Sequence, residues 1–238
     1  MIIEGSLSVK AAIENKKRTI NNVLISEGKK SKDIQYIKHL CYKNNIHFEY
    51  KSKETINEIA IGRTHGGVIA DVDYRFNETI EDINQGNVLL VEGVEDPYNL
   101  GMMLRTCAAA GFVAVITNDR DYQDSEATIL KASAGASDAL IWVRTDNFKL
   151  QLEKIKSRGY QVVSALRSHL SISYDQHQYS DKTCLCVGGE RRGLSKDVIE
   201  ASDMLVHILY DSNVKIALSS VSATAVIAFE IVRQRRNQ

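Results

Sequence analysis

The chain has 238 residues, of which 44% are hydrophobic, so it can bury the core of one large domain or of two modest ones. Its 30 lysines and arginines match 30 aspartates and glutamates, which excludes a protein that coats polyanions through its net charge alone. The four cysteines form no C-x-x-C pair and have no histidine at metal spacing, which argues against a zinc site and a disulfide framework. The start lacks a signal-peptide pattern and no apolar run is long enough to span a membrane, which predicts a cytoplasmic protein with no membrane partner.

Helix-like and strand-like segments alternate through residues 1–75, which predicts a small α/β domain. Residues 1–71 hold 12 lysines and arginines against 8 carboxylates, with clusters at Lys16–Arg18 and at Lys29–Lys32. These clusters are typical of a solvated surface. They indicate contact with phosphates only if other features point to a nucleic acid.

Residues 76–86 are polar and acidic with scattered apolar residues, and we predict a linker there. From residue 87 the alternation is stronger, with apolar strand-like runs at 87–93, 113–117, 139–143, 160–166 and 183–189, and a final helix at 217–235. Buried parallel strands show this pattern. Residues 87–238 are therefore expected to form a parallel sheet with helices on both faces.

Polar residues follow the first of these strands in the stretch EGVEDPYNLGMMLRTCAAAGF. Pro97 and Asn99 indicate a shaped turn that leads into a helix. The helix carries Arg105 among residues that are largely apolar, so we expect its guanidinium to meet either a ligand or a buried carboxylate.

A glycine-rich loop, VGGERRGLS, follows the strand at 183–189. Leu194 stands where a phosphate-binding loop would have its lysine, and no G-x-G-x-x-G fingerprint occurs. What remains is a turn that can approach a ligand closely and that carries Glu190 and two arginines, or else an ordinary strand-to-helix connection. Further on, three serines near position 220 mark a helix start, where hydroxyls cap free amides.

Together these stretches resemble the motifs of the SpoU/TrmH branch of the SPOUT RNA methyltransferases. The first motif, D-P-x-N-x-G-x-x-x-R, is intact from Asp96 to Arg105, and the second, G-x-E-x-x-G-L, runs from Gly188 to Leu194. The segment from Lys131 to Leu140 is similar to the SAGA segment of the family. The resemblance implies a Rossmann-like domain with a trefoil knot over residues 87–238. Residues 1–75 resemble the L30e-like RNA-binding domain that precedes it in the family.

The third motif departs from the family pattern S-L-N-V-S-V-A. Aligned through the final helix, the chain has Ser219 where the family has asparagine, and a frame shifted by one residue puts Ser220 there. In either frame the asparagine is missing. Serine keeps a donor and an acceptor but is shorter, so activity or substrate alignment is expected to change.

The resemblance implies methyl transfer from S-adenosylmethionine (SAM) to a ribose 2′-hydroxyl of rRNA or tRNA, in a homodimer formed through the second domain and without a metal. The implied catalytic residues are Arg105, Asn99, Glu190 and Ser219. The implied SAM-binding residues are Leu166, Gly188, Ile208 and Leu218. For RNA contact we select Lys16, Lys17, Arg18 and Arg63 from the basic first domain.

Two other functions stay open at this point. The altered third motif is compatible with a catalytically weakened RNA-binding or ribosome-associated protein of the same fold. The glycine-rich loop alone is compatible with an α/β enzyme that acts on a small nucleotide. RNA affinity without turnover would favour the first, and catalysis on free nucleosides would favour the second.

Overall fold

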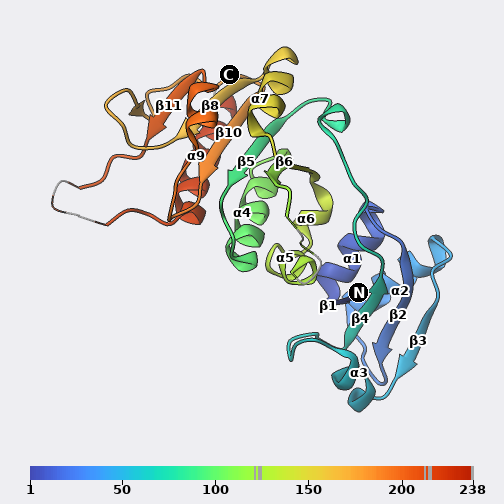
Figure 1. Ribbon diagram of the computed structural model, residues 1–238. Helices are drawn as coiled ribbons and strands as arrows, with labels where there is room; N and C mark the ends of the chain where they lie inside the picture. Colours follow the sequence, from blue (N-terminus) through green and yellow to red (C-terminus); the bar gives the residue numbers. More distant parts are fainter. Residues whose placement is uncertain (121, 123–124, 212, 214–215, 237–238) are drawn as a thin grey trace. The chain divides into compact units, whose positions relative to one another are not determined.

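The computed structural model describes residues 1–120, 122, 125–211, 213 and 216–236. The described residues form two units, and their elements are labelled in Figure 1. The smaller unit contains residues 1–76 and also the two helices α5 (Glu126–Ala132) and α6 (Ala136–Ala139). The larger unit contains the remaining described residues from Asn77 onward.

The smaller unit is built on a mixed sheet of four strands in the order β1-β4-β2-β3. Strands β2 and β3 are parallel, whereas β4 runs antiparallel to both β1 and β2. Isoleucines and valines that alternate along these strands pack against α1 and α2 to form the core. Its other elements are β1 (Ile2–Glu4), α1 (Ser6–Asn15), β2 (Ile20–Ser26), α2 (Lys32–Lys43), β3 (Phe48–Lys51), α3 (Lys53–Ile59) and β4 (Val68–Val72).

The SAGA-like segment packs on α1, inside the smaller unit. Gly135 has φ 89°, and a Cβ there would lie 2.4 Å from the Cβ of Ala11, so only glycine permits this close approach. The sequence hypothesis assigned this segment to the domain of residues 87–238. The structure instead groups it with the N-terminal residues, because a small-residue turn of this kind allows two backbones to touch.

A buried ionic cluster joins α5 and α6 to the rest of the smaller unit. The Arg18 guanidinium donates to both carboxylate oxygens of Asp138, at 3.0 and 2.6 Å, and to Oε1 of Glu126 at 2.6 Å. Arg75 also contacts Asp138 and Glu126, the latter through its backbone N–H. Burial opposes the charge of Arg18, but hydrogen bonds and attraction from the two carboxylates prevail and raise its pKa.

The larger unit is an all-parallel sheet of seven strands in the order β7-β6-β5-β10-β8-β11-β9. Parallel neighbours require crossover connections, which the helices supply. The strands are β5 (Asn87–Glu92), β6 (Phe112–Asn118), β7 (Ile141–Thr145), β8 (Gln161–Ala165), β9 (Ile172–Ser173), β10 (Thr183–Gly188) and β11 (Met204–His207). The helices are η1 (Ile80–Asp82), α4 (Pro97–Ala109), α7 (Phe148–Ser157), α8 (Lys196–Glu200) and α9 (Ser220–Arg236). The sheet and its crossovers confirm the α/β class.

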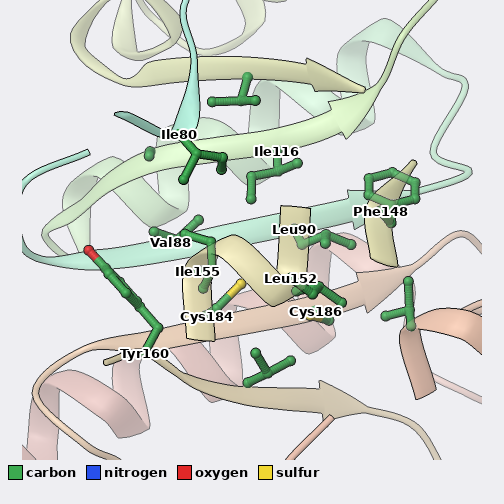
Figure 2. Close-up of a cluster of buried hydrophobic side chains, with 14 of the residues drawn as sticks. Ile80, Val88, Leu90, Ile116, Phe148, Leu152, Ile155, Tyr160, Cys184 and Cys186 are labelled. Atoms are coloured by element: carbon green, nitrogen blue, oxygen red, sulfur yellow. The ribbon is translucent and has the colours of Figure 1, made fainter. Parts of the chain in front are cut away.

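The centre of the larger unit is a layer of mostly aliphatic side chains between the sheet and α7, with Phe148, Tyr160 and two cysteines among them (Figure 2). Ile80 and Ile83 belong to this core and are completely or almost completely buried. Residues 77–86 of the expected linker are therefore a structural part of the larger unit. Ile80 and Ile83 point into its core, whereas Phe76, the last residue of the smaller unit, is 55% exposed.

No helix among the described residues is both long enough and apolar enough to cross a membrane.

Candidate active site

A cavity of about 570 Å³ opens at the carboxyl ends of β5, β6 and β10. This is the edge at which open parallel sheets bind ligands. Three loops and the first residue of α9 contribute to its wall. The lining residues are Gly93, Val94, Glu95, Asp96, Asn99, Asn118, Arg120, Gly189, Glu190, Arg191, Arg192 and Ser220.

The loop after β5 is shaped by the start of α4. Asp96 caps the helix by accepting the backbone N–H of Asn99 at 2.8 Å, and Pro97 fits the first helical position because it needs no donor there. Asn118, at the end of β6, accepts the backbone N–H of Gly93 at 3.0 Å. Arg120 donates to the backbone carbonyl of Glu95 at 3.1 Å. These contacts fix the loop, and Asn99, a residue of the first motif, lines the cavity.

The glycine-rich loop is folded back on itself and against the loop after β5. The Gly189 N–H donates to the carbonyl of Glu92 at 2.7 Å, and the carboxylate of Glu92 accepts the N–H of Ser195 at the start of α8. A Cβ on Gly189 would lie 2.1 Å from the carbonyl oxygen of Gly93. Because both atoms in that clash would be fixed to backbone, only glycine fits. The turn presents the exposed Glu190 at the cavity.

The start of α9 distinguishes the two serines of the third motif. Ser219 caps the helix: its Oγ accepts the N–H of Ser222 at 3.2 Å and donates to the Ser222 hydroxyl at 3.1 Å. Ser220 is buried and lines the cavity. The serine at the cavity is therefore Ser220, the residue selected by the shifted frame, while the Ser219 hydroxyl caps α9.

Arg105 lies on the exposed face of α4 and does not line the cavity. Its apolar neighbours Leu104 and Cys107 point into the core, whereas Tyr98 and Met102 share its exposed face. The expectation of an apolar environment that demands a partner was wrong, because sequence proximity on a helix does not place side chains on one face. Within one chain the motif is thus divided between the cavity and an outer surface.

None of the four residues expected to hold SAM lines the cavity, but three of them lie at the same edge of the sheet. Leu166, Gly188 and Ile208 stand at the carboxyl ends of the adjacent strands β8, β10 and β11. The N–H of Leu218, just before α9, donates to the hydroxyl of Tyr210, at 3.2 Å. This places the last of the four near the loop after β11.

The residues selected for RNA contact do not form one surface. Lys16 and Lys17 precede β2, whereas Arg63 precedes β4; these strands are antiparallel, so the two groups lie at opposite ends of the sheet. Lys16 and Arg63 are exposed. Arg18 is 4% exposed and holds two carboxylates, so the structure contradicts its selection as an RNA contact.

Asn118 and Arg120 were missed by the sequence analysis. Both follow the strand at 112–118, and the rule that ligands bind beyond the ends of parallel strands was applied only to glycine-rich loops. The tetrapeptide TNDR directly after an apolar run was the available signal.

The cysteines are free and buried. Burial raises the pKa of the Cys41 thiol to about 11 and moves that of Cys107 in the same direction. In the part of the chain that the structure describes, no three histidine, cysteine or carboxylate side chains are grouped to hold a metal ion.

The chain is similar to known proteins over almost its whole length. Residues 86–229 match the SpoU rRNA Methylase family, and residues 2–76 match the domain described as RNA 2′-O ribose methyltransferase substrate binding. The 23S rRNA (guanosine-2′-O-)-methyltransferase RlmB of Pasteurella multocida is 30% identical, with 98% of each chain covered. The enzyme of that name from Escherichia coli K12 is 28% identical at the same coverage.

Solved structures share the fold over nearly the whole chain. A protein described as an RNA 2′-O ribose methyltransferase has a TM-score of 0.79 at 23% identity, covering 99% of this chain and 89% of its own. The SpoU methyltransferase AviRb from Streptomyces viridochromogenes, in complex with AdoMet, has a TM-score of 0.81 at 19% identity, covering 99% and 90%. These findings confirm the family resemblance seen in the motifs: the chain belongs to the SpoU rRNA methylase family.

Proposed function

We propose that the protein is a SAM-dependent methyltransferase that modifies the 2′-hydroxyl of a guanosine ribose in 23S rRNA. The observation that carries the proposal is the cavity at the carboxyl ends of β5, β6 and β10, which gathers Asn99, Glu190 and Ser220 from three motifs. The relatives named for this reaction match the chain from end to end. An rRNA substrate would place the enzyme in the cytoplasm.

The loops beyond β8, β10 and β11 fit the cofactor. Leu209, Ile216 and Leu218 are large apolar side chains that are 67%, 77% and 42% exposed there, and an adenosine group would cover such a surface. Backbone groups at the ends of three adjacent strands supply donors and acceptors for its polar edge. SAM supplies an electrophilic methyl group, so the protein has to align the acceptor and manage its proton.

The cavity has the size for one nucleotide drawn out of an RNA strand, and its wall carries arginines that would meet the phosphate beside three carboxylates. Its volume of about 570 Å³ lies within the usual range for small-ligand sites, about 300–1,000 Å³. Arg120, Arg191 and Arg192 bring three guanidinium groups to its wall, and guanidinium groups match phosphate geometry. Enzymes that act on a nucleotide generally extrude it into a pocket of this kind.

Four side chains would have separate roles in holding the RNA and promoting methyl transfer. Asn99 would hold the substrate-side loop, and the Ser220 hydroxyl would contact the ribose in the place of the asparagine of the family. Arg105 would bind the adjoining phosphate and stabilise the negative charge that develops on the 2′-oxygen as its proton leaves. Glu190 would orient that guanidinium, since a carboxylate accepts bidentate donation.

A homodimer would bring Arg105 into an interface. Helices α4 and α9 pack side by side (Figure 1), and their outer faces expose Tyr98 at 62%, Met102 at 50% and Phe229 at 48%. Large apolar side chains gathered on one surface are typical of a contact with another protein. A second copy that covers this face would also cover Arg105, which explains why a catalytic guanidinium lies outside the cavity of a single chain.

The trefoil knot also belongs to the proposal. Strand β11 lies near one edge of the sheet, yet the chain that follows it returns to pack α9 against β10 and α4. This return path is what a chain needs in order to pass through a loop. Knots are rare in proteins, and the family membership is the main support for one here.

The test incubates the full chain with methyl-labelled SAM and total RNA from a strain that lacks the gene. We expect label in 23S rRNA, and a loss of about 10²-fold or more with Arg105→Ala, the size typical of a removed transition-state contact. Arg236→Ala, which removes an exposed arginine at the end of α9, is the matched control and should label normally. RNA binding without any label from the wild type would contradict the proposal, and label restored by Ser220→Asn would then show that the altered third motif had lost catalysis.

A further inference from the structure

An aromatic group lies on the surface of the smaller unit, where α2 meets the edge strand β3. Tyr42 packs edge to face on Phe48, with ring centroids 5.3 Å apart and planes at 89°, and Phe48 packs on Tyr50 at 6.2 Å and 80°. The Nζ of Lys38, one turn before Tyr42, lies 5.9 Å from the Phe48 centroid and 5.7 Å from that of Tyr50. We call these four residues the aromatic platform.

The platform is more exposed than packing of the core requires. Tyr42 is 70% exposed and Tyr50 is 44% exposed, while only Phe48 reaches the core of the unit. Single exposed aromatic residues are ordinary, but three in mutual contact leave a continuous apolar surface in water. The platform therefore has ring faces available to a ligand.

The charge around the platform is positive. Residues 29–54, which contain α2 and β3, hold seven lysines against three carboxylates. This excess equals that of the whole first 71 residues, so the net positive charge of those residues is concentrated in this segment. Exposed aromatic rings in a lysine-rich segment are the combination found in proteins that bind single-stranded nucleic acid, where bases stack and phosphates meet cations.

We propose that the aromatic platform binds unpaired nucleotides of the RNA substrate, with a base stacked on Tyr42 or Tyr50 and an adjoining phosphate at Lys38. The proposal rests on the proposed function, since it assigns a surface by which the same enzyme holds its RNA. It specifies single-stranded RNA because base faces are free to stack only outside a duplex. It also replaces the basic residues near position 17 as the main RNA contact of the smaller unit.

The surface could instead meet protein, because β3 is an edge strand and a second copy could pair with it. The excess of lysine in residues 29–54 argues against a second copy of the chain at this surface. An excess of lysine on both partners would be repulsive in a contact between identical chains, whereas it is complementary to phosphate.

The experiment measures binding of the full chain to a fluorescein-labelled single-stranded RNA of mixed sequence and to the same RNA annealed as a duplex. Tyr42→Ala and Tyr50→Ala should each raise the Kd for the single strand by about fivefold or more, the lower end for loss of one stacked base. Tyr42→Phe keeps the ring and should bind normally, whereas Tyr42→Leu keeps apolar area without stacking and should resemble Ala. Lys38→Ala should lower the slope of log Kd against log salt by about 1.

Tyr36→Ala is the matched control. Tyr36 lies on the same helix with 45% exposure, but it stacks on His39 and donates to Glu14, away from the platform. It should leave the Kd unchanged. Equal affinity of wild type, Tyr42→Ala and Tyr50→Ala would overturn the proposal, as would a change of sedimentation coefficient on Tyr42→Ala, which would identify an interface between copies.

The two proposals can fail separately. If the wild type methylates 23S rRNA and the platform variants bind RNA as well as the wild type does, the proposed role of the platform is refuted and the methyltransferase proposal stands. If binding of single-stranded RNA depends on the aromatic rings but no methyl group is transferred, the role of the platform stands and the methyltransferase proposal is refuted.

Discussion

Replacing Arg18 by methionine tests the ionic cluster of the smaller unit. Methionine fills similar volume without charge, so the variant leaves Asp138, which is 0% exposed, and Glu126, which is 6% exposed, without their main cation. Breaking one partner of a buried ion pair typically costs about 3–5 kcal/mol. We expect a loss of that size in the free energy of unfolding, which is a large share of the usual total of about 5–15 kcal/mol.

The assay is urea unfolding followed by far-ultraviolet circular dichroism, with hydrogen exchange to locate the change. The loss should appear as faster exchange in α5 and α6, the helices that the cluster holds. Asp138→Asn should cost much less in the Arg18→Met background than in the wild type, since the two residues form one network. Arg63→Met, at an exposed position, is the control and should stay within about 0.5 kcal/mol of the wild type.

If Arg18→Met lowers the free energy of unfolding by less than about 1 kcal/mol, no more than the control does, the reasoning is refuted, because removing one partner of a buried ion pair leaves the other charge buried and unpaired. RNA binding separates the two roles considered for this residue. A phosphate contact would lower the salt slope by about 1 on mutation, whereas the structural role predicts an unchanged slope for the folded variant.

Three further predictions follow from the larger unit. Gly189→Ala places a Cβ 2.1 Å from the Gly93 carbonyl oxygen, so the cavity loop must move and methyl transfer should fall by about 10²-fold. Gly159→Ala, at a residue with positive φ but with open space around it, should retain transfer. Met102→Glu should convert a dimer into a monomer in light scattering, and an unchanged mass would exclude the α4 and α9 face as the interface. Burial lowers the pKa of His177, so the unfolded chain binds more protons and stability should decrease as the pH falls below about 6.5; His177→Gln should flatten that dependence, and an unchanged profile would count against it.

Much of the larger unit could be predicted because buried parallel strands have continuous runs of apolar residues in the sequence. The strand at 87–92 is an example, since its valines and leucines are buried on both faces. Strand β11 is short and half-exposed, and β9 has two residues, so neither leaves such a run. Their pairing is decided by neighbours in the sheet rather than by local sequence.

The ionic cluster shows where local patterns fail. Arg18 reads as part of the basic run Lys16–Arg18, and nothing nearby indicates burial. Its partners lie 108 and 120 residues further along the chain, so only the tertiary structure reveals them. A run of basic residues in a sequence therefore does not show which of its side chains are exposed.

The motifs predicted only part of the lining of the candidate site, and Arg105, although it belongs to the first motif, lies outside the cavity. Asn99 and Glu190 follow from the motifs and both line the cavity. Asn118 and Arg120 line it too, but no spacing rule marks them. The choice between Ser219 and Ser220 depended on which hydroxyl caps α9, a matter of helix geometry that sequence leaves open.

The most direct test of the central claim asks which atom receives the methyl group. A 2′-O-methylated ribose cannot form the cyclic intermediate of alkaline cleavage, so the adjoining phosphodiester bond survives. 23S rRNA labelled by the purified protein with methyl-labelled SAM is therefore hydrolysed in alkali and the products are separated by charge. The account predicts label in alkali-resistant dinucleotides that begin with guanosine, and label in mononucleotides, which marks a methylated base, would contradict it.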